Sequence, residues 1–554
     1  MENKNIIIAV TLSMLILLGW SYFIDAPQQA KKKVELQNQK ISSPTLQAQS
    51  QSKIVSRSEA IKGESRINIE NNNLIGSISL KGALIDDITL KNYREDISKD
   101  SKEIVLLNPK KTLEGYFVES GWATKGDVRV PDNNSVWQVR EGRKLTPNTP
   151  VTLQWNNGEG VTFIKKIEVD DKYLFKITET VRNDKAKAIE LYSYSQITKN
   201  QEPTTKKFYI LHEGFITVLN KNLKEEDFSD IKKETKNYNG NSGWVGITDK
   251  YWMAAAVPEF GKSFKVEFSY KDTYKANYVA TDATVISPQK SASSNIKIFA
   301  GAKDVKTIDD YAEKEKIDRF DLSIDWGWFY FITKPLFFVM DYIYKVVGNF
   351  GIAIIVITFL VRIIFFPLAN YSYRSMAKMK VLQPEMLRIK ELYKDDARKT
   401  QQEIMSLYKR ENVNPLSGCL PILIQIPIFF AVYKMLFVTL EMRQAPFFGW
   451  IKDLSAADPT TIFNLFGLIP WSPPSFLMIG VWPILMGVTM WFQQKLNPAP
   501  IDPIQAKIFQ FFPIMLTVML ASFPSGLVVY WTISNVLTIG QQWFIMRQTK
   551  TKTV

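Results

Sequence analysis

The strongest constraint on the fold is the clustering of apolar residues into long runs. Each run is close to, or longer than, the roughly 20 apolar residues that a helix needs to cross a bilayer. The average composition, 46% hydrophobic and 22% charged, resembles by contrast that of an ordinary soluble protein. The runs exclude a wholly soluble chain. They occupy residues 6–24, 350–368, 419–440, 475–492 and 508–546.

Cysteine and histidine are scarce. The 554-residue chain holds one cysteine, Cys419, and one histidine, His212. An intrachain disulfide, a CxxC redox pair, an HExxH zinc site and any catalytic arrangement built on several histidines are therefore excluded. The net charge of +14 favours anionic partners such as lipid head groups or RNA. We expect no enzyme activity, no metal, no cofactor and no DNA partner.

The N-terminal run is long and ends in the aromatic residues Trp20, Tyr22 and Phe23. A cleaved signal peptide is the alternative, but its apolar core usually has only about 7–15 residues before a small-residue cleavage site. We interpret residues 1–25 as an uncleaved transmembrane signal anchor. Residues 26–60 are rich in Gln, Ser and Lys, which predicts a flexible linker on the external side.

The charges of the short loops set the predicted topology. Residues 370–416 carry ten basic and six acidic residues, whereas residues 441–474 carry two basic and three acidic ones. The positive-inside rule places the first loop, the N-terminus and the basic tail 547–554 in the cytoplasm. The loop 441–474 is then external and 495–507 cytoplasmic. This parity requires an even number of spans, and six transmembrane helices are predicted in 1–25, 348–369, 417–440, 475–494 and, as a pair, 508–546.

Residues 61–318 predict a large external domain made of strands. Segments such as 161–169, 173–181 and 263–270 alternate apolar and polar residues between turn residues, as half-buried strands do. Many such strands at short spacing predict a β-sandwich. Residues 319–347 are aromatic but charged, which favours an amphipathic helix in the outer interface. If this segment crossed the membrane instead, the basic loop would be outside.

The cytoplasmic loop 370–416 predicts a helical hairpin. Apolar residues recur every three or four positions on an otherwise basic first helix, and Asp395 and Asp396 are placed to break it and cap a second helix ending near Leu407. The simpler interpretation is that the apolar stripe packs the two helices together. The alternative is that the hairpin docks adaptable apolar segments or ribosomal RNA, and both interpretations can hold. The stripe consists of Met376, Met379, Leu382, Met386, Ile389 and Tyr393.

Arg362 lies inside a predicted span, about six residues or roughly 9 Å from its cytoplasmic end. A charge there costs at least about 2.5 kcal/mol, so a functional role is the default interpretation, with snorkelling to the head groups as the alternative. No Asp or Glu occurs within the apolar spans themselves, counted as 6–24, 349–368, 417–438, 475–494, 508–523 and 525–546. The arginine therefore needs water and polar side chains, and we predict that these line a hydrated groove in the inner leaflet. The candidates are Thr358, Gln425, Tyr530, Trp531, Ser534 and Asn535.

Four blocks resemble the Oxa/Alb/YidC family of membrane protein insertases, in its Gram-negative form with a large periplasmic domain. They are GNFGIAIIVITFLVRIIFFPL (348–368), VNPLSGCLPILIQIPIFFAVYKML (413–436), MRQAP (442–446) and FPSGLVVYWTISNVLTIGQQ (523–542). The resemblance covers the whole chain. It implies an inner-membrane insertase with a five-helix core after the anchor, and a periplasmic β-supersandwich similar to carbohydrate-binding folds.

The resemblance also implies roles for single residues. Arg362 falls on the family's groove arginine, and Thr358 and Tyr530 fall on groove-lining positions. Positions that meet the incoming helix are matched by Ile426, Pro427 and Met519. The chain departs from the family pattern at Trp531, where a second tyrosine is often found, and in a longer external loop at 460–475.

The resemblance predicts an insertase and chaperone that performs no chemistry and works alone or with the Sec translocon. Its expected partners are nascent membrane proteins, the Sec translocon, the ribosome and anionic phospholipids. One rival is a solute transporter or channel with an anion site at Arg362, although neither internal repeats nor broken midplane helices are evident. The other is a receptor or envelope enzyme whose β domain binds a glycan. Deleting most of 61–310 would abolish that second function but largely spare an insertase.

Overall fold

The computed structural model describes residues 54–203, 211–394, 396–414, 420–469, 471, 473–474, 477–498 and 503–551. The predicted signal anchor and the predicted linker up to residue 53 lie outside these ranges. The described residues from 54 to 498 and from 512 to 551 form one compact unit.

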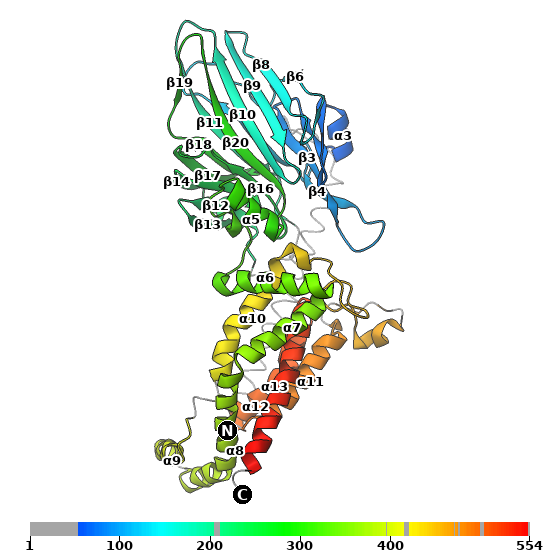
Figure 1. Ribbon diagram of the computed structural model, residues 1–554, viewed down its shortest axis with the longest axis vertical. Coiled ribbons are helices and arrows are strands. Elements are labelled where there is room, and N and C mark those ends of the chain that lie inside the picture. Colours follow the sequence, from blue (N-terminus) through cyan, green and yellow to red (C-terminus); the bar gives the residue numbers. More distant parts are fainter. Residues whose placement is uncertain are drawn as a thin grey trace, which may run out of the picture. The chain divides into compact units, whose positions relative to one another are not determined.

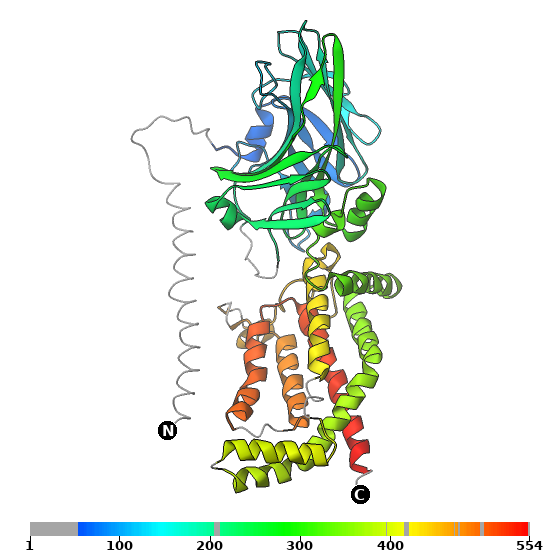
Figure 2. The ribbon, with the colours of Figure 1, turned by 90° about the vertical axis from the view of Figure 1, so that its left-hand side faces the viewer.

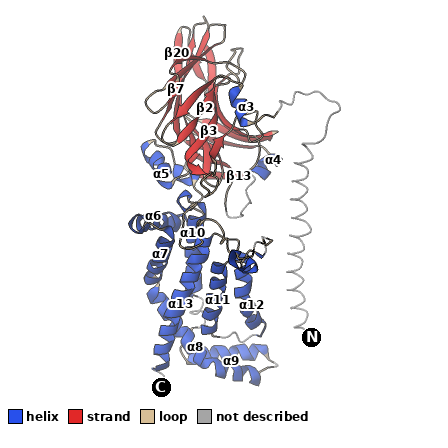
Figure 3. Ribbon diagram, turned by 90° about the vertical axis from the view of Figure 1, so that its right-hand side faces the viewer, coloured by secondary structure: helices blue, strands red, loops and turns tan. Residues whose placement is uncertain are grey.

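The first half of the chain folds into two stacked sheets (Figures 1 and 3). Neighbouring strands run antiparallel, except for the parallel pair β1 and β7. The larger sheet has the order β14 (Lys236–Gly240), β17 (Phe264–Lys271), β18 (Thr273–Ala280), β11 (Ile189–Lys199), β5 (Tyr116–Ala123), β3 (Leu84–Arg94), β2 (Leu74–Ser79), β1 (Arg66–Glu70), β7 (Lys144–Leu145), with β19 (Thr284–Ile286) paired to β11 and β4 (Glu103–Leu107) to β3. The smaller sheet has the order β13 (Asn222–Asp227), β12 (Gly214–Leu219), β15 (Gly243–Thr248), β16 (Trp252–Val257), β20 (Lys290–Ala302), β10 (Leu174–Asn183), β9 (Val161–Val169), β8 (Val151–Asn156), β6 (Gln138–Glu141).

Alternating side chains build the core between the sheets. In β9, Val161, Phe163 and Ile167 are buried, whereas Lys166 on the opposite face is exposed. The same period of two appears in β17, where Phe264 is the first of three buried alternate residues. The predicted all-β domain is thus confirmed, and its stability comes from this apolar core.

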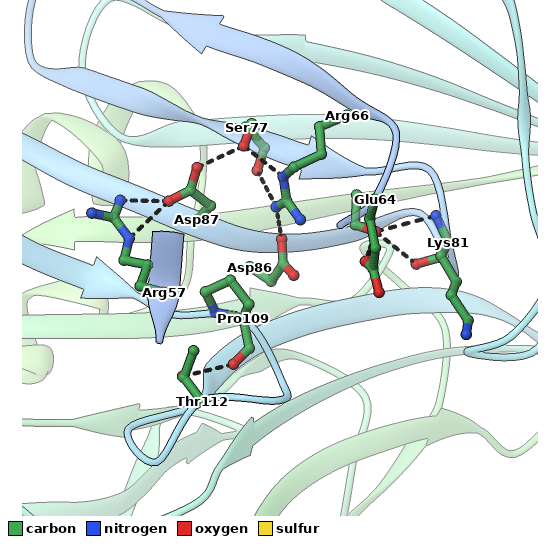
Figure 4. Close-up of polar contacts among 10 residues, drawn as sticks. Arg57, Glu64, Arg66, Ser77, Lys81, Asp86, Asp87, Pro109 and Thr112 are labelled. Atoms are coloured by element: carbon green, nitrogen blue, oxygen red, sulfur yellow. Dashed lines mark hydrogen bonds and ion pairs between the residues drawn. The ribbon is translucent and has the colours of Figure 1, made fainter. Parts of the chain in front are cut away.

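A buried polar cluster ties β1 to β2 and β3 (Figure 4). Arg66 pairs with Asp86, and both side chains are 5% exposed or less. Arg66 Nε also donates to Ser77 Oγ at 2.7 Å, and Ser77 Oγ donates to Asp87 Oδ2 at 2.6 Å. Burial raises the pKa of Asp86 to about 6, although the positive charge of Arg66 acts in the opposite direction.

The helix α3 (Arg57–Lys62) precedes β1 and corrects the expected linker, which was predicted to continue to residue 60. Ser56 and Glu59 form a capping box, each bonding to the other's backbone N–H. From this helix, Arg57 reaches Asp87 in the polar cluster. The Ser-x-x-Glu pattern typical of a capping box is present in the sequence, but the polar residues around it indicated a linker instead of a helix.

Helices form the second half of the chain. Two short helices, α4 (Phe228–Lys233) and α5 (Val305–Lys314), and a 3₁₀ turn, Phe320–Ser323, accompany the sheets. They are followed by α6 (Tyr330–Val347), α7 (Phe350–Ile364), α8 (Phe366–Leu392), α9 (Ala397–Arg410), α10 (Leu420–Val438), the 3₁₀ turns Leu440–Met442 and Ile462–Gly467, α11 (Val481–Leu496), α12 (Pro503–Leu520) and α13 (Ser525–Thr551). No single described helix is long and apolar enough to cross a bilayer, but α7 and α8 together satisfy that test as a bent pair.

The helix α6 is shorter than the predicted segment 319–347. One face buries Thr333, Phe337 and Met340, while Phe331 and Tyr342 on the other face are exposed. This pattern agrees with the predicted amphipathic character. Gly348 ends the helix because it adopts the left-handed conformation, with φ at 70°, that glycine accepts at low cost.

A bend of 68° separates α7 from α8, so the segment predicted as one span, 348–369, is two helices. Phe365 breaks the regular conformation, and Pro367 lies in the first turn of α8. Proline has no N–H to donate, and its ring clashes with the carbonyl four residues earlier. The helix α8 therefore begins before the predicted boundary and continues far into the hairpin.

The predicted hairpin is present as α8 and α9, which lie side by side (Figures 2 and 3). Asp396 caps α9 by accepting from Lys399 N at 2.9 Å, as expected, and the helix continues three residues beyond Leu407. Met386 of the apolar stripe accepts a weak bond from Tyr408 of α9. Met376 instead packs in a cluster with Ile545 of α13. Met386 thus packs the two hairpin helices together, as the simpler interpretation expects, whereas Met376 packs against α13.

The segment predicted as a helix over 475–494 begins later, at Val481. Gly480 stands at its N-terminus, and the described residues just before it are not helical. Two prolines at 473 and 474 favour an irregular approach, because each restricts the residue before it to an extended conformation.

Candidate functional site

Arg362 lies in the last turn of α7, and its guanidinium contacts α13. Its Nη2 donates to Ser534 Oγ at 2.7 Å and to the Ser534 carbonyl at 3.1 Å. In the described part of the chain, no carboxylate forms an ion pair with Arg362. Its side chain therefore points to a neighbouring helix, and neutral oxygen atoms hold its charge.

The face of α13 that meets Arg362 is a polar row at helical spacing. Tyr530, Ser534 and Thr538 follow one another every four residues, and all three are buried. Thr538 Oγ1 donates to the Ser534 carbonyl at 2.7 Å, so this oxygen accepts from both Thr538 and Arg362. One turn away, Gln425 Nε2 of α10 donates to the Tyr530 hydroxyl at 2.9 Å. The positive charge of Arg362 also interacts electrostatically with the Tyr530 side chain.

Two residues that the sequence did not single out complete this arrangement. Tyr373 of α8 is buried, and its hydroxyl interacts with Arg362 and Thr538. Thr538 could have been found from its spacing of four from Ser534. Tyr373 gave no signal, because its proximity depends on the bend between α7 and α8. We call Arg362, Tyr373, Gln425, Tyr530, Ser534 and Thr538 the Arg362 cluster.

The structure does not bring every predicted groove residue into this cluster. Thr358 is buried, and its hydroxyl donates to the Ile354 carbonyl of its own helix at 2.6 Å. Asn535 points toward α11, where its Nδ2 donates to Thr489 Oγ1 at 3.2 Å. Trp531 packs against Phe429 with ring centroids 4.7 Å apart. Successive helical residues are about 100° apart, so Ser534 and Asn535 face different helices.

The residues predicted to meet an incoming helix lie on exposed apolar surfaces. In α10, Leu423, Ile426 and Phe430 are each more than 40% exposed and recur at spacings of three and four. Pro427 beside them is half-buried, and Met519 of α12 is 51% exposed. Such a surface is suited to apolar segments or lipid tails. The contact with a client helix stays a prediction.

Comparison with known proteins identifies the chain over its whole length. The family model described as YidC periplasmic domain matches residues 66–339, and that described as 60Kd inner membrane protein matches residues 342–552. The membrane protein insertase YidC of Pelagibacter ubique is 50% identical to this chain, and the alignment covers 100% of both chains. The YidC of Beijerinckia indica subsp. indica is 46% identical, over 100% of this chain and 97% of its own.

One solved structure, an active YidC insertase with its first transmembrane domain resolved, aligns with 86% of this chain and 92% of its own. The identity is 16% and the TM-score 0.36. The two family models and the full-length relatives at up to 50% identity agree with the all-β first half and the helical second half. The chain belongs to the YidC family of membrane protein insertases, inner-membrane proteins with a periplasmic domain.

Proposed function

We propose that this protein inserts membrane proteins without an energy-supplying ligand, using the Arg362 cluster as the polar part of a hydrated groove. The observation that carries the proposal is the environment of Arg362. Its guanidinium is bound by the hydroxyl and carbonyl of Ser534, and no ion pair is found within the described residues. A cation held by neutral groups keeps its net charge, which makes it able to attract an acidic client flank.

In this mechanism, a client helix approaches from the cytoplasm with a short polar flank. The flank enters the groove, where Arg362 and water lower the cost of carrying polar groups partway across the bilayer. The helix then slides along the exposed apolar surface of α10 and α12 into lipid. Each Leu-like residue contributes about 0.3–0.6 kcal/mol near the bilayer centre, and the membrane potential adds about 2.3 kcal/mol per charge per 100 mV.

The orientation follows from the loop charges, which favour a cytoplasmic N-terminus, C-terminus and α8–α9 hairpin. The basic hairpin and the tail 547–554 then face the ribosome and anionic phospholipids. The Sec translocon is proposed as a partner from the family resemblance, and help in client folding as a second role. Deletion of most of the periplasmic domain, with α6 retained, should leave insertion largely intact.

Insertion into liposomes that hold only this purified protein tests the proposal. The client is a short single-span protein with an acidic flank, and the readout is protease-protected product. Wild type, Arg362→Ala and Arg362→Lys are compared. The matched control is Arg182→Ala, which removes an equal charge from an exposed position in β10.

We expect Arg362→Ala to lose insertion of this client, while Arg362→Lys and Arg182→Ala retain it. A client whose acidic flank residues are replaced by amides should depend less on Arg362. Unimpaired insertion by Arg362→Ala would show that the arginine is not needed and would favour snorkelling. If folded wild type inserted nothing beyond empty liposomes, autonomous insertion would be refuted.

A further inference from the structure

The loop that joins the 3₁₀ turn Leu440–Met442 to α11 contains an unusually apolar segment. No charged residue occurs from 459 to 494. We call the described residues of 462–471 the apolar tip. Leu468 is 83% exposed, and the other large apolar side chains of the tip are also exposed. These are Ile462, Phe463, Leu465, Phe466, Ile469 and Trp471.

A polar neck holds the two ends of this loop together. Asp458 Oδ1 accepts from Thr460 N at 3.0 Å, while its Oδ2 accepts from Trp482 N at 3.0 Å on the far side of the loop. Thr460 Oγ1 accepts from Val481 N at 3.0 Å, and Thr461 Oγ1 donates to the Leu477 carbonyl at 2.8 Å. The neck fixes the loop at the N-terminus of α11, so the apolar tip projects from a defined base.

The backbone of the tip is itself held in an unfavourable conformation. Leu465 and Phe466 have φ of 49° and 58°, in the left-handed region that residues with a branched or bulky side chain rarely adopt. Local bonds maintain this turn, including Phe466 N to the Thr461 carbonyl at 2.9 Å and Ile469 N to the Asn464 carbonyl at 3.0 Å. The turn directs consecutive large side chains outward, where water alone would not stabilise them.

We propose that the apolar tip inserts into the outer leaflet of the inner membrane and anchors the loop to lipid. Membership of an inner-membrane family places a bilayer beside this loop. Its composition of Leu, Ile, Phe and a tryptophan suits the boundary between head groups and acyl chains. Without a charge it has no basis for a salt bridge, so its lipid contact does not depend on anionic head groups. The proposal rests on membrane location and, for the choice of leaflet, on the proposed orientation, and it does not involve the Arg362 cluster.

Spin labelling of the full-length chain in liposomes tests this anchor. Cys419, the sole cysteine, is replaced by serine, and a label is placed at Leu468→Cys, with Phe466→Cys as a second site. Collisions with oxygen, which partitions into lipid, are compared with those of a water-soluble nickel complex by electron paramagnetic resonance. The matched control is Phe260→Cys, an 86% exposed aromatic position in the periplasmic domain.

We expect the ratio of oxygen accessibility to nickel accessibility to be several-fold higher at the two tip labels than at the Phe260 label. This difference should be the same in zwitterionic and anionic liposomes. Nickel accessibility equal to that of the control would place the tip in water and overturn the proposal. Labels protected from both reagents would show a protein contact instead and would also overturn it. Lipid burial that appears only with anionic head groups would refute a charge-independent anchor.

Discussion

Replacing Glu441 by glutamine is expected to remove a pH dependence from the contact between the periplasmic domain and α10. Glu441 follows α10, and its Oε1 accepts from the Val305 N–H at 3.0 Å, at the start of α5. Its Oε2 is buried, and no N–H or hydroxyl group of the described residues donates to it. Asp304, which caps α5 through a 2.8 Å bond from Thr307 N, lies beside it. Two carboxyl groups thus share one small site.

Burial, and then the negative charge of Asp304, raise the pKa of Glu441 from 4.5 to about 8. Tyr93 lies near both carboxyl groups and near Arg443, and the charges of all three act on its phenol. Since the folded state holds the proton more tightly, its stabilisation is complete below pH 4.5 and is lost as the pH rises to about 8. At about 1.36 kcal/mol per pH unit, the upper limit of the resulting change in the free energy of unfolding is on the order of 5 kcal/mol. Because Glu441 as a whole is only half-buried, we expect about 2 kcal/mol.

Hydrogen exchange of the full-length protein, corrected for the intrinsic effect of pH, measures this difference at the start of α5. Between pH 4 and pH 9, the wild-type protection of the Val305 amide should fall by up to about 30-fold, the equivalent of 2 kcal/mol. In Glu441→Gln the protection should hardly change. Glu313→Gln removes a charge from an exposed position of α5 and serves as the control. If wild type and Glu441→Gln lost protection equally, the Glu441 carboxyl would not be the titrating group.

The remaining predictions concern stability. Arg66→Met alone should destabilise the periplasmic domain by about 3–5 kcal/mol, because it leaves Asp86 buried without its partner. Adding Asp86→Leu should recover most of the loss, and urea titration followed by circular dichroism gives both values. Gly487→Ala should lower the thermal midpoint in detergent because its methyl would overlap α12, whereas Gly540→Ala, in open space on α13, should stabilise by about 1 kcal/mol. Asp396→Ala should cost α9 about 1 kcal/mol, seen as faster hydrogen exchange in that helix, and unchanged exchange would contradict its role as a cap.

The sequence predicted the parts of the fold that depend on local periodicity. The strand Val161–Val169 was predicted at both ends because alternation and turn residues define it. The cap at Asp396 was also readable. The bend at Phe365 was not predicted, since its neighbour Pro367 stands in an otherwise continuous apolar run. The late start of α11 at Val481 was concealed in the same way, because hydropathy does not distinguish helix from irregular apolar chain.

The candidate site was predictable in its chemistry but only in part in its membership. The absence of acids near Arg362 in the sequence indicated neutral partners, and Ser534 was among those named. Which polar residues of α13 face α7 depends on the rotation of that helix. This rotation separates Ser534 from Asn535. Tyr373 belongs to the Arg362 cluster only because the chain bends after α7.

The neutral environment of Arg362 has a consequence for how an insertion groove can work. A carboxylate partner would satisfy the guanidinium, but it would also cancel most of the field that a client flank senses. The carbonyl and hydroxyl of Ser534 instead orient the cation while leaving its net charge in place. In the proposed groove, at about 4 Å and an effective dielectric constant near 20, such a charge would attract a client carboxylate by about 4 kcal/mol. This attraction exceeds the gain from a membrane potential of 100 mV, about 2.3 kcal/mol per charge, yet it is weak enough for release. An arginine held by the neutral oxygen atoms of Ser534 therefore suits a proposed site that binds each client flank transiently.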